Sequence, residues 1–93
     1  MNLSKLNEVN HLQTELEYIK LRIRQVYERL LTEAQELATK TNALNDFMRT
    51  QKFVDLDRQN KDLLYQQSRL MNEYLQVLGQ RIELLGEKFS FKK

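Results

Sequence analysis

The sequence predicts an all-α fold: an antiparallel two-helix hairpin with a long first helix, assembling into a symmetric helical oligomer. The chain of 93 residues has no proline and only two glycines, and 30% of its residues are charged, a composition typical of long helices. Its apolar residues also recur with helical spacing. At this length we expect one domain, residues 1–93, whose core is small in a single copy.

The first predicted helix covers residues 4–49. Its apolar residues alternate at intervals of three and four, the spacing of a coiled-coil seam. After Leu30 the second line of this seam turns polar, and its place is taken one residue later by Ala34, Thr41 and Met48. The stripe therefore drifts from a 3.5-residue toward a 3.6-residue period, which predicts coiled-coil packing at the front and hairpin packing at the rear. The two seam lines are Val9, Leu16, Ile23, Leu30, Leu37 and Leu44, and Leu12, Ile19 and Val26.

A bend at residues 50–56 and a second helix at 57–86 follow. Asp55 or Asp57 is suited to cap this helix at its start, and Gly86 is expected to end it. The tail, residues 87–93, alternates apolar and polar residues around Phe89 and Phe91. This alternation suits a short strand, a segment that docks on a partner, or a loose end.

The two helices differ in length, and this difference predicts an oligomer. The first would span roughly 69 Å and the second roughly 45 Å, which leaves about 16 N-terminal residues without a partner helix in the same chain. This overhang nevertheless has apolar residues on one face, and leaving each in water forfeits about 1.5–3 kcal/mol. We expect a second chain to cover it; the alternative is that the overhang folds back as a separate short helix. The residues concerned are Leu6, Val9, Leu12, Leu16 and Ile19.

The second helix has a column of polar residues between two apolar lines. The lines lie about 100° apart, and the column falls between them, which predicts polar residues in the middle of a buried arc. Buried polar groups must be hydrogen-bonded, and a buried arginine costs most. The column is either a ladder that fixes register or the lining of a wet cavity that meets a polar ligand; exposure on a poorly packed face would also explain it. The lines are Leu56, Leu63, Leu70, Val77 and Leu84, and Leu64, Met71, Leu78 and Leu85; the column is Phe53, Asn60, Gln67, Tyr74 and Arg81.

A basic belt in the first helix supplies a second group of candidate binding residues. Arginine guanidinium groups bind phosphates bidentately, and tyrosine rings stack on bases. The alternative is a solvated flank with ordinary ion pairs between chains. Tyr18, Arg22 and Arg29 project along one flank of the apolar stripe, and Lys20, Arg24 and Tyr27 along the other.

Several function classes have no support in the sequence. A lone His11, the absence of cysteine and the absence of a glycine-rich phosphate loop argue against a metal site, a cofactor site and a nucleotide-hydrolysing enzyme. No serine has a plausible base near it in sequence, so we expect no enzyme activity. No apolar run is long enough for a membrane span, and the cysteine-free composition suits the cytoplasm. A net charge of only +2 argues against a nucleic-acid polymer as ligand.

The stretch from Glu28 to Leu85 resembles small phage-encoded helical hairpin proteins. The residues that support the resemblance are Glu28-Arg29-Leu30-Leu31, Glu36-Leu37, Leu44, Phe47, Phe53, Leu56, Leu63-Leu64, Gln67, Met71, Tyr74 and Val77-Leu78-Gly79-Gln80-Arg81-Ile82. Such hairpins include sponges that assemble into oligomers, often hexamers. They sequester cyclic nucleotide or cyclic ADP-ribose-type messengers of the host CBASS and Thoeris immune systems.

The resemblance implies a non-catalytic anti-defence protein in the host cytoplasm. It would form a homo-oligomer, a hexamer or another even number, so that each arginine and tyrosine occurs at least twice around an axis. The candidate contacts to a cyclic nucleotide are then Arg81, Tyr74, Gln67 and Asn60, with the belt from Tyr18 to Arg29. The alternative is a structural or adaptor coiled coil that binds a protein partner through the overhang or the tail.

Overall fold

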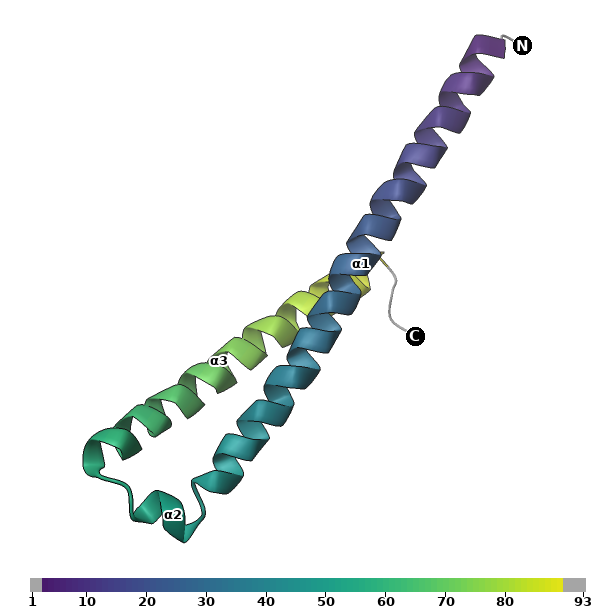
Figure 1. The fold of residues 1–93 in the computed structure, drawn as a ribbon. Helices are drawn as coiled ribbons and strands as arrows, with labels where there is room; N and C mark the ends of the chain where they lie inside the picture. Colours follow the sequence, from purple (N-terminus) through teal and green to yellow (C-terminus); the bar gives the residue numbers. More distant parts are fainter. Residues whose placement is uncertain (1–2, 90–93) are drawn as a thin grey trace.

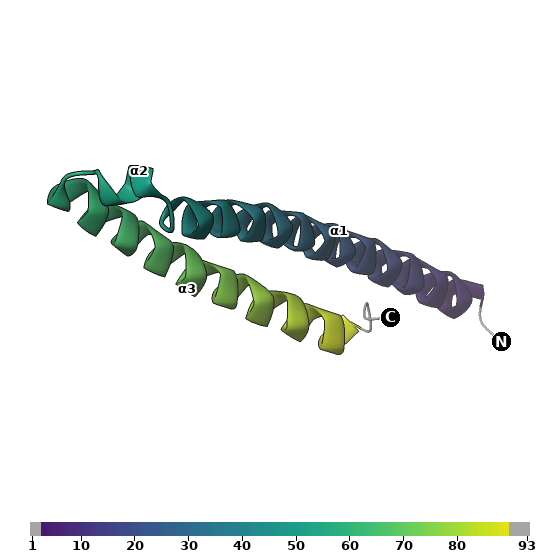
Figure 2. The same ribbon diagram turned by 90° about the horizontal axis from the view of Figure 1, so that it is seen from below.

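Two long antiparallel helices dominate the fold (Figure 1). In this computed structural model the backbone is described for residues 3–89 and the side chains for residues 12–89. Helix α1 runs over Leu3–Phe47, the short α2 over Gln51–Val54 and α3 over Arg58–Phe89. Helices α1 and α3 lie side by side in both views (Figures 1 and 2). The prediction of an all-α fold is confirmed, because every element of the described residues is a helix.

The hairpin core lies where the rear half of α1 meets α3. Leu78 is completely buried, and Leu30 is almost completely buried. Thr41 is also buried, and its hydroxyl donates a hydrogen bond of 2.7 Å to the backbone carbonyl of Leu37, which satisfies its polar atom. The predicted drift of the α1 stripe is observed: Ala34, Thr41 and Met48 are buried or half-buried.

The bend between the long helices is an ordered turn that includes α2. Thr50 caps α2: its hydroxyl oxygen accepts a hydrogen bond from the backbone N–H of Phe53. The ring of Phe53 is buried and makes edge-on contacts with Phe47 at 6.3 Å and with Tyr65 at 5.4 Å between ring centroids. These aromatic contacts join the end of α1 to the first turns of α3. The chain therefore turns at a small apolar cluster.

Helix α3 begins at an Asp57 cap and continues past Gly86. A carboxylate oxygen of Asp57 accepts a hydrogen bond of 2.8 Å from the backbone N–H of Asn60. The sequence expectation that Gly86 ends the helix is wrong, since α3 continues to Phe89. Phe89 is half-buried, and its burial offsets the roughly 1 kcal/mol by which a glycine disfavours a helix. Phe91 of the predicted tail lies outside the described residues.

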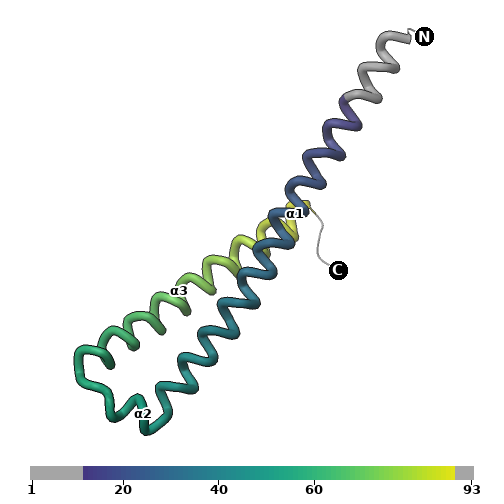
Figure 3. The backbone as a smooth tube through the Cα atoms, viewed as in Figure 1, coloured from purple at the N-terminus to yellow at the C-terminus, as the bar shows by residue number. Residues whose placement is uncertain are grey.

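Helix α1 extends far beyond the C-terminal end of α3 (Figures 1 and 3). Since α1 is continuous from Leu3 to Phe47, the alternative of an overhang that folds back as a separate helix is wrong. The molecule is consequently elongated, with extents of 79 × 24 × 15 Å. No helix in the described part of the chain is long and apolar enough to span a membrane.

Candidate ligand-binding face

The polar column of α3 lies at the edge of the hairpin interface and is exposed. Asn60, Gln67, Tyr74 and Arg81 are all exposed in the single chain, so within one copy they lie on an uncovered face and not in a buried ladder. Helix α1 packs on the line of Leu64, Met71, Leu78 and Leu85 and on the line of Ser68, Leu75 and Ile82. These two adjacent lines form one stripe, and a single neighbouring helix covers only one stripe. The polar column is therefore left beside the interface.

The other apolar line of α3 is exposed as well. Leu63, Leu70, Val77 and Leu84 have between 49% and 66% of their surface accessible to solvent. They follow the polar column on the side away from α1, because residues three or four positions apart are neighbours on a helix surface. The column is thus bordered by the buried line on one side and by this exposed line on the other. We call Leu63, Leu70, Val77 and Leu84 the outer line.

One contact joins the polar column to α1. The hydroxyl of Tyr74 donates a hydrogen bond to a carboxylate oxygen of Glu33. This hydrogen bond raises the pKa of Tyr74, with smaller contributions from desolvation and from the negative charge of Glu33, while the positive charge of Arg81 opposes the shift. The contact fixes which side of α1 faces the column. We call this side of the hairpin the Tyr74 side.

The Glu33–Tyr74 contact also sets the register on the Tyr74 side. In an antiparallel pair, moving seven residues back along α1 and seven forward along α3 places Val26 opposite Arg81. Arg29 precedes Glu33 by one turn, and Arg22 lies three turns before it, so both arginines project on the same side of α1. The structure therefore brings part of the basic belt to the same face as the column.

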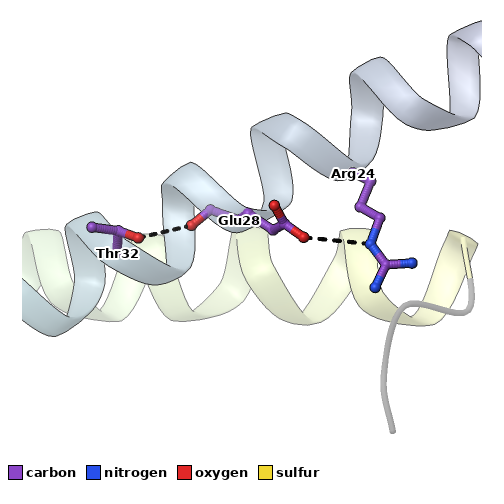
Figure 4. A network of polar contacts seen from close by, with 3 residues as sticks. All are labelled: Arg24, Glu28 and Thr32. Carbon is purple, nitrogen blue, oxygen red and sulfur yellow. Dashed lines mark hydrogen bonds and ion pairs between the residues drawn. The ribbon is translucent and has the colours of Figure 1, made fainter.

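The remaining belt residues are divided by the helix. Lys20 and Arg24 project from the opposite side of α1, since they lie about half a turn away from Glu33 in angle. The Nε of Arg24 forms an ion pair of 3.4 Å with the side-chain carboxylate of Glu28 (Figure 4). The backbone carbonyl of Glu28 accepts a hydrogen bond from the Thr32 hydroxyl. Tyr27 is half-buried against α3. These three residues of the belt do not share the Tyr74 side.

Tyr18 and Arg22 form a local pair in the overhang. The Arg22 guanidinium donates a hydrogen bond of 3.2 Å to the Tyr18 hydroxyl and lies 5.9 Å from the centre of its ring. Both residues are exposed on the N-terminal half of α1. The pair is a cationic and aromatic surface of α1. Such a pair suits a flat, anionic ligand.

Two shallow grooves flank the Glu33–Tyr74 contact. One lies along α1 and includes Arg29, Glu33 and Glu36. The other lies along α3 and includes Gln67, Leu70 and Tyr74, with an apolar floor. Both are open to solvent. Among the described residues, no group of histidine, cysteine, aspartate and glutamate side chains is arranged to hold a metal ion.

The sequence reasoning missed Glu33 as a residue of this face. The only sequence signal was its position on the heptad line of Val26, Ile19 and Leu12, which was interpreted as a seam that turns polar. The contact with Tyr74 joins residues 41 positions apart. A pattern within one helix does not give the partner of a residue on another helix.

The hairpin is the part of the chain that matches a known family. The model of the Sequestin family matches residues 24–84, which is well over half of the chain. The chain belongs to the Sequestin family. The match begins in α1 where the overhang meets the hairpin and ends within the last turns of α3. No curated protein and no solved structure gave a significant match.

Membership in the Sequestin family divides the candidate residues into two groups. Arg29, Glu33, the polar column and the outer line lie within the matched hairpin. Tyr18, Lys20 and Arg22 precede the matched residues. The family name denotes sequestration, which is binding without turnover. This agrees with the expectation from sequence of a protein that binds and does not catalyse.

Proposed function

We propose that this member of the Sequestin family is a phage-encoded anti-defence protein that forms homo-oligomers and sequesters a cyclic nucleotide immune messenger. It would act in the host cytoplasm and have no catalytic role. The family name supports sequestration. The identity of the ligand class rests on the resemblance to phage sponges and on the chemistry of the Tyr74 side.

The observation that carries the proposal is the composition of the exposed Tyr74 side. Arg81, Arg29 and Arg22 project on this side, and guanidinium groups bind phosphate oxygens bidentately. Tyr74 is 46% exposed, and its ring offers a flat surface on which a purine can stack. Gln67 and Asn60 add amide donors and acceptors. A cyclic nucleotide presents the complementary groups: anionic phosphates and flat bases.

Direct titration tests this proposal. We expect the wild-type protein to bind one or more members of a panel of cyclic dinucleotides, cyclic trinucleotides and cyclic ADP-ribose isomers in isothermal titration calorimetry. Arg81→Ala removes one charge-assisted phosphate contact, so we expect a loss of about 10- to 100-fold in affinity. Arg69→Ala is the matched control, because Arg69 lies on α3 away from the column and forms an ion pair of 3.7 Å with Glu73.

The outcomes separate the proposal from its residue assignment. Unchanged affinity in both Arg81→Ala and Arg22→Ala would contradict the assignment of the site to the Tyr74 side. No heat with any panel member, from folded wild-type protein, would contradict the messenger-binding function. Intact ligand recovered after denaturation is expected, because sequestration leaves the messenger unchanged.

The overhang favours one alternative, an adaptor that binds a helical protein partner. Leu12, Leu16 and Ile19 are between 51% and 60% exposed on α1, and heptad-spaced apolar residues are suited to another helix. A protein partner that binds the overhang with no effect of any cyclic nucleotide would favour this function.

A further inference from the structure

The Tyr74 side combines two unpartnered apolar stripes with the polar column. On α3 the outer line is exposed over its whole length. On α1, Leu12, Ile19 and Val26 occupy the same heptad line as Glu33 and are also exposed. Because Glu33 contacts Tyr74, Val26, one heptad before Glu33, is directed toward the same side as the outer line. A heptad line in a straight helix drifts by about 20° per repeat, so Ile19 and Leu12 turn toward the side on which α1 packs against α3. The overhang therefore continues the apolar surface at the end of the hairpin.

We propose that a second copy of this chain packs on the Tyr74 side through a two-fold axis, and that the messenger site is built from both copies. The shared ligand site in this inference rests on the proposed function, whereas the interface between the two copies does not. In this arrangement the outer line and the Leu12–Val26 line form the contact between copies. Arg81 and Tyr74 of one copy would form one half of the site, and the same two residues of the second copy would form the other half.

The periodicity of the exposed stripes argues for a second copy as the occupant. Both stripes repeat every seven residues, the spacing that packs against another helix of the same kind. The outer line spans 21 residues, or about 32 Å, so its partner must present a long straight helix with apolar heptads. This chain presents two such helices. In a two-fold contact each copy supplies the same patch, so the stripes cover each other.

The size of the face suits a stable dimer. Two helix diameters of about 10 Å and a length of about 32 Å give a strip on the order of 600 Å², before the overhang is added. A stable interface takes roughly 800 Å² from each partner. Covering the exposed leucines and valines also removes the unfavourable exposure of their side chains to water. The charges of the face are mixed, since Arg29 lies with Glu33 and Glu36 in one groove and Arg81 belongs to the polar column, so the face can pair with its own copy.

A single copy does not enclose a ligand on this face. The two grooves beside the Glu33–Tyr74 contact are shallow and open, whereas small-molecule sites bury about 70–90% of their ligand. The polar column is bordered by apolar lines, so a second copy on the outer line would place a wall over Tyr74 and Arg81. The site is therefore incomplete without the partner. Two copies of Arg81 would also match a ligand with two phosphates.

Charge substitutions on the outer line test the interface. We expect Val77→Glu to reduce the mass measured by light scattering to half of the wild-type value or less, because a carboxylate would be buried between copies. Leu31→Glu is the matched control: Leu31 is 40% exposed on the other side of α1, and we expect its mass to remain that of wild type. Far-UV circular dichroism checks that both variants keep their helices. A Val77→Glu protein with wild-type mass would overturn the interface.

Single cysteines provide a second test that does not depend on a disruptive charge. The chain has no cysteine, so Leu70→Cys, Val77→Cys or Leu84→Cys introduces one defined thiol. We expect a short bis-maleimide to cross-link at least one of these variants into a covalent dimer, and Leu31→Cys to stay monomeric on denaturing gels. Cross-linking of Leu31→Cys alone would overturn the proposed face.

The shared site is tested separately from the proposed function. If wild-type protein binds a panel member, we expect Val77→Glu to bind it at least 10-fold more weakly. Wild-type affinity in a monomeric Val77→Glu protein would overturn the shared site while the proposed function stands. If wild type dimerises through this face and binds no panel member, the interface stands, and the proposed function and the shared site both fail.

Discussion

At the scale of single residues, the Glu33–Tyr74 contact is the feature that organises the Tyr74 side. It is a side-chain hydrogen bond between α1 and α3, and it lies between the two open grooves. Arg81 lies two turns after Tyr74 on the same face of α3, and the proposed function assigns a base to Tyr74 and a phosphate to Arg81. The Glu33 carboxylate also repels phosphate, so Glu33 restricts where on this face an anion binds.

The titration of Tyr74 is a prediction at this scale. A tyrosine loses its proton at an ordinary pKa of about 10, and the contact with Glu33 raises the pKa of Tyr74 above that value. The raised pKa in the folded state means that the contact stabilises the fold at pH values below 10 and is lost as the pH rises through the folded-state pKa. We expect NMR of Cζ-labelled tyrosine to give a lower pKa for Tyr74 in Glu33→Gln. Glu36→Gln is the control and should leave this pKa at its wild-type value; an unchanged pKa in Glu33→Gln would refute the contact.

At the scale of elements, the two apolar lines of α3 have different roles. The line of Leu78 is buried against α1 and stabilises the hairpin, while the line of Leu84 is exposed. Since the two lines have similar composition, they are distinguished only by their position relative to α1. The bend with its Phe53 cluster fixes that position by joining the end of α1 to the start of α3.

Matched alanine substitutions measure this difference. Leu78→Ala removes a completely buried side chain, so we expect the free energy of unfolding to fall by about 2–5 kcal/mol. Leu84→Ala, at 66% exposure, should cost under about 1 kcal/mol in the single chain. Urea unfolding at low protein concentration compares the two. Equal losses would contradict the packing of the Leu78 line against α1.

Gly79 is a smaller feature of the same helix. A glycine inside a helix often permits a close approach of another backbone or a ligand. Among the described residues, no atom beyond the glycine's own stretch of helix backbone lies within 4 Å of a Cβ placed there, so no contact in this part of the chain requires a glycine. Its position on α3 is away from Tyr74 in angle, and it does not belong to the proposed interface.

At the scale of the whole molecule, the chain is an elongated hairpin with an uncovered extension. Its radius of gyration is 22.2 Å, far above the roughly 12 Å of a compact domain of this length. Few apolar side chains are fully buried among the described residues, the core being Leu30, Phe53 and Leu78. A core of this size gives a single copy marginal stability. The association proposed above would add further burial.

The stability of the whole molecule should therefore depend on protein concentration. Association of two folded chains raises the stability of the dimer by mass action, by about 1.4 kcal/mol for a tenfold increase in concentration, or about 0.7 kcal/mol per chain. We expect the thermal midpoint to rise by roughly 3–6 °C over that increase. Differential scanning fluorimetry across a hundredfold range of concentration measures this. A midpoint that does not change would indicate a chain that unfolds as a monomer.

The sequence by itself predicted the two long helices and the overhang, but neither α2 nor the continuation of α3 past Gly86. The absence of proline and the heptad lines allow little other than long helices, and Asp57 was identified as a cap for the second helix. The drift of the α1 stripe to Ala34 and Met48 was also predictable. These features depend on neighbours in the chain, which a sequence records directly.

Only the tertiary structure decided which faces of the helices meet. The lines of Leu78 and Leu84 lie about 100° apart on α3 and are equally apolar, so periodicity does not choose between them. The choice depends on contacts across the hairpin, such as the 3.0 Å hydrogen bond from the Ser68 hydroxyl to the Asn45 side chain. It placed the polar column at an exposed edge and brought Glu33 to Tyr74. Packing between distant segments has no local signature, because it follows from the shapes of both surfaces together.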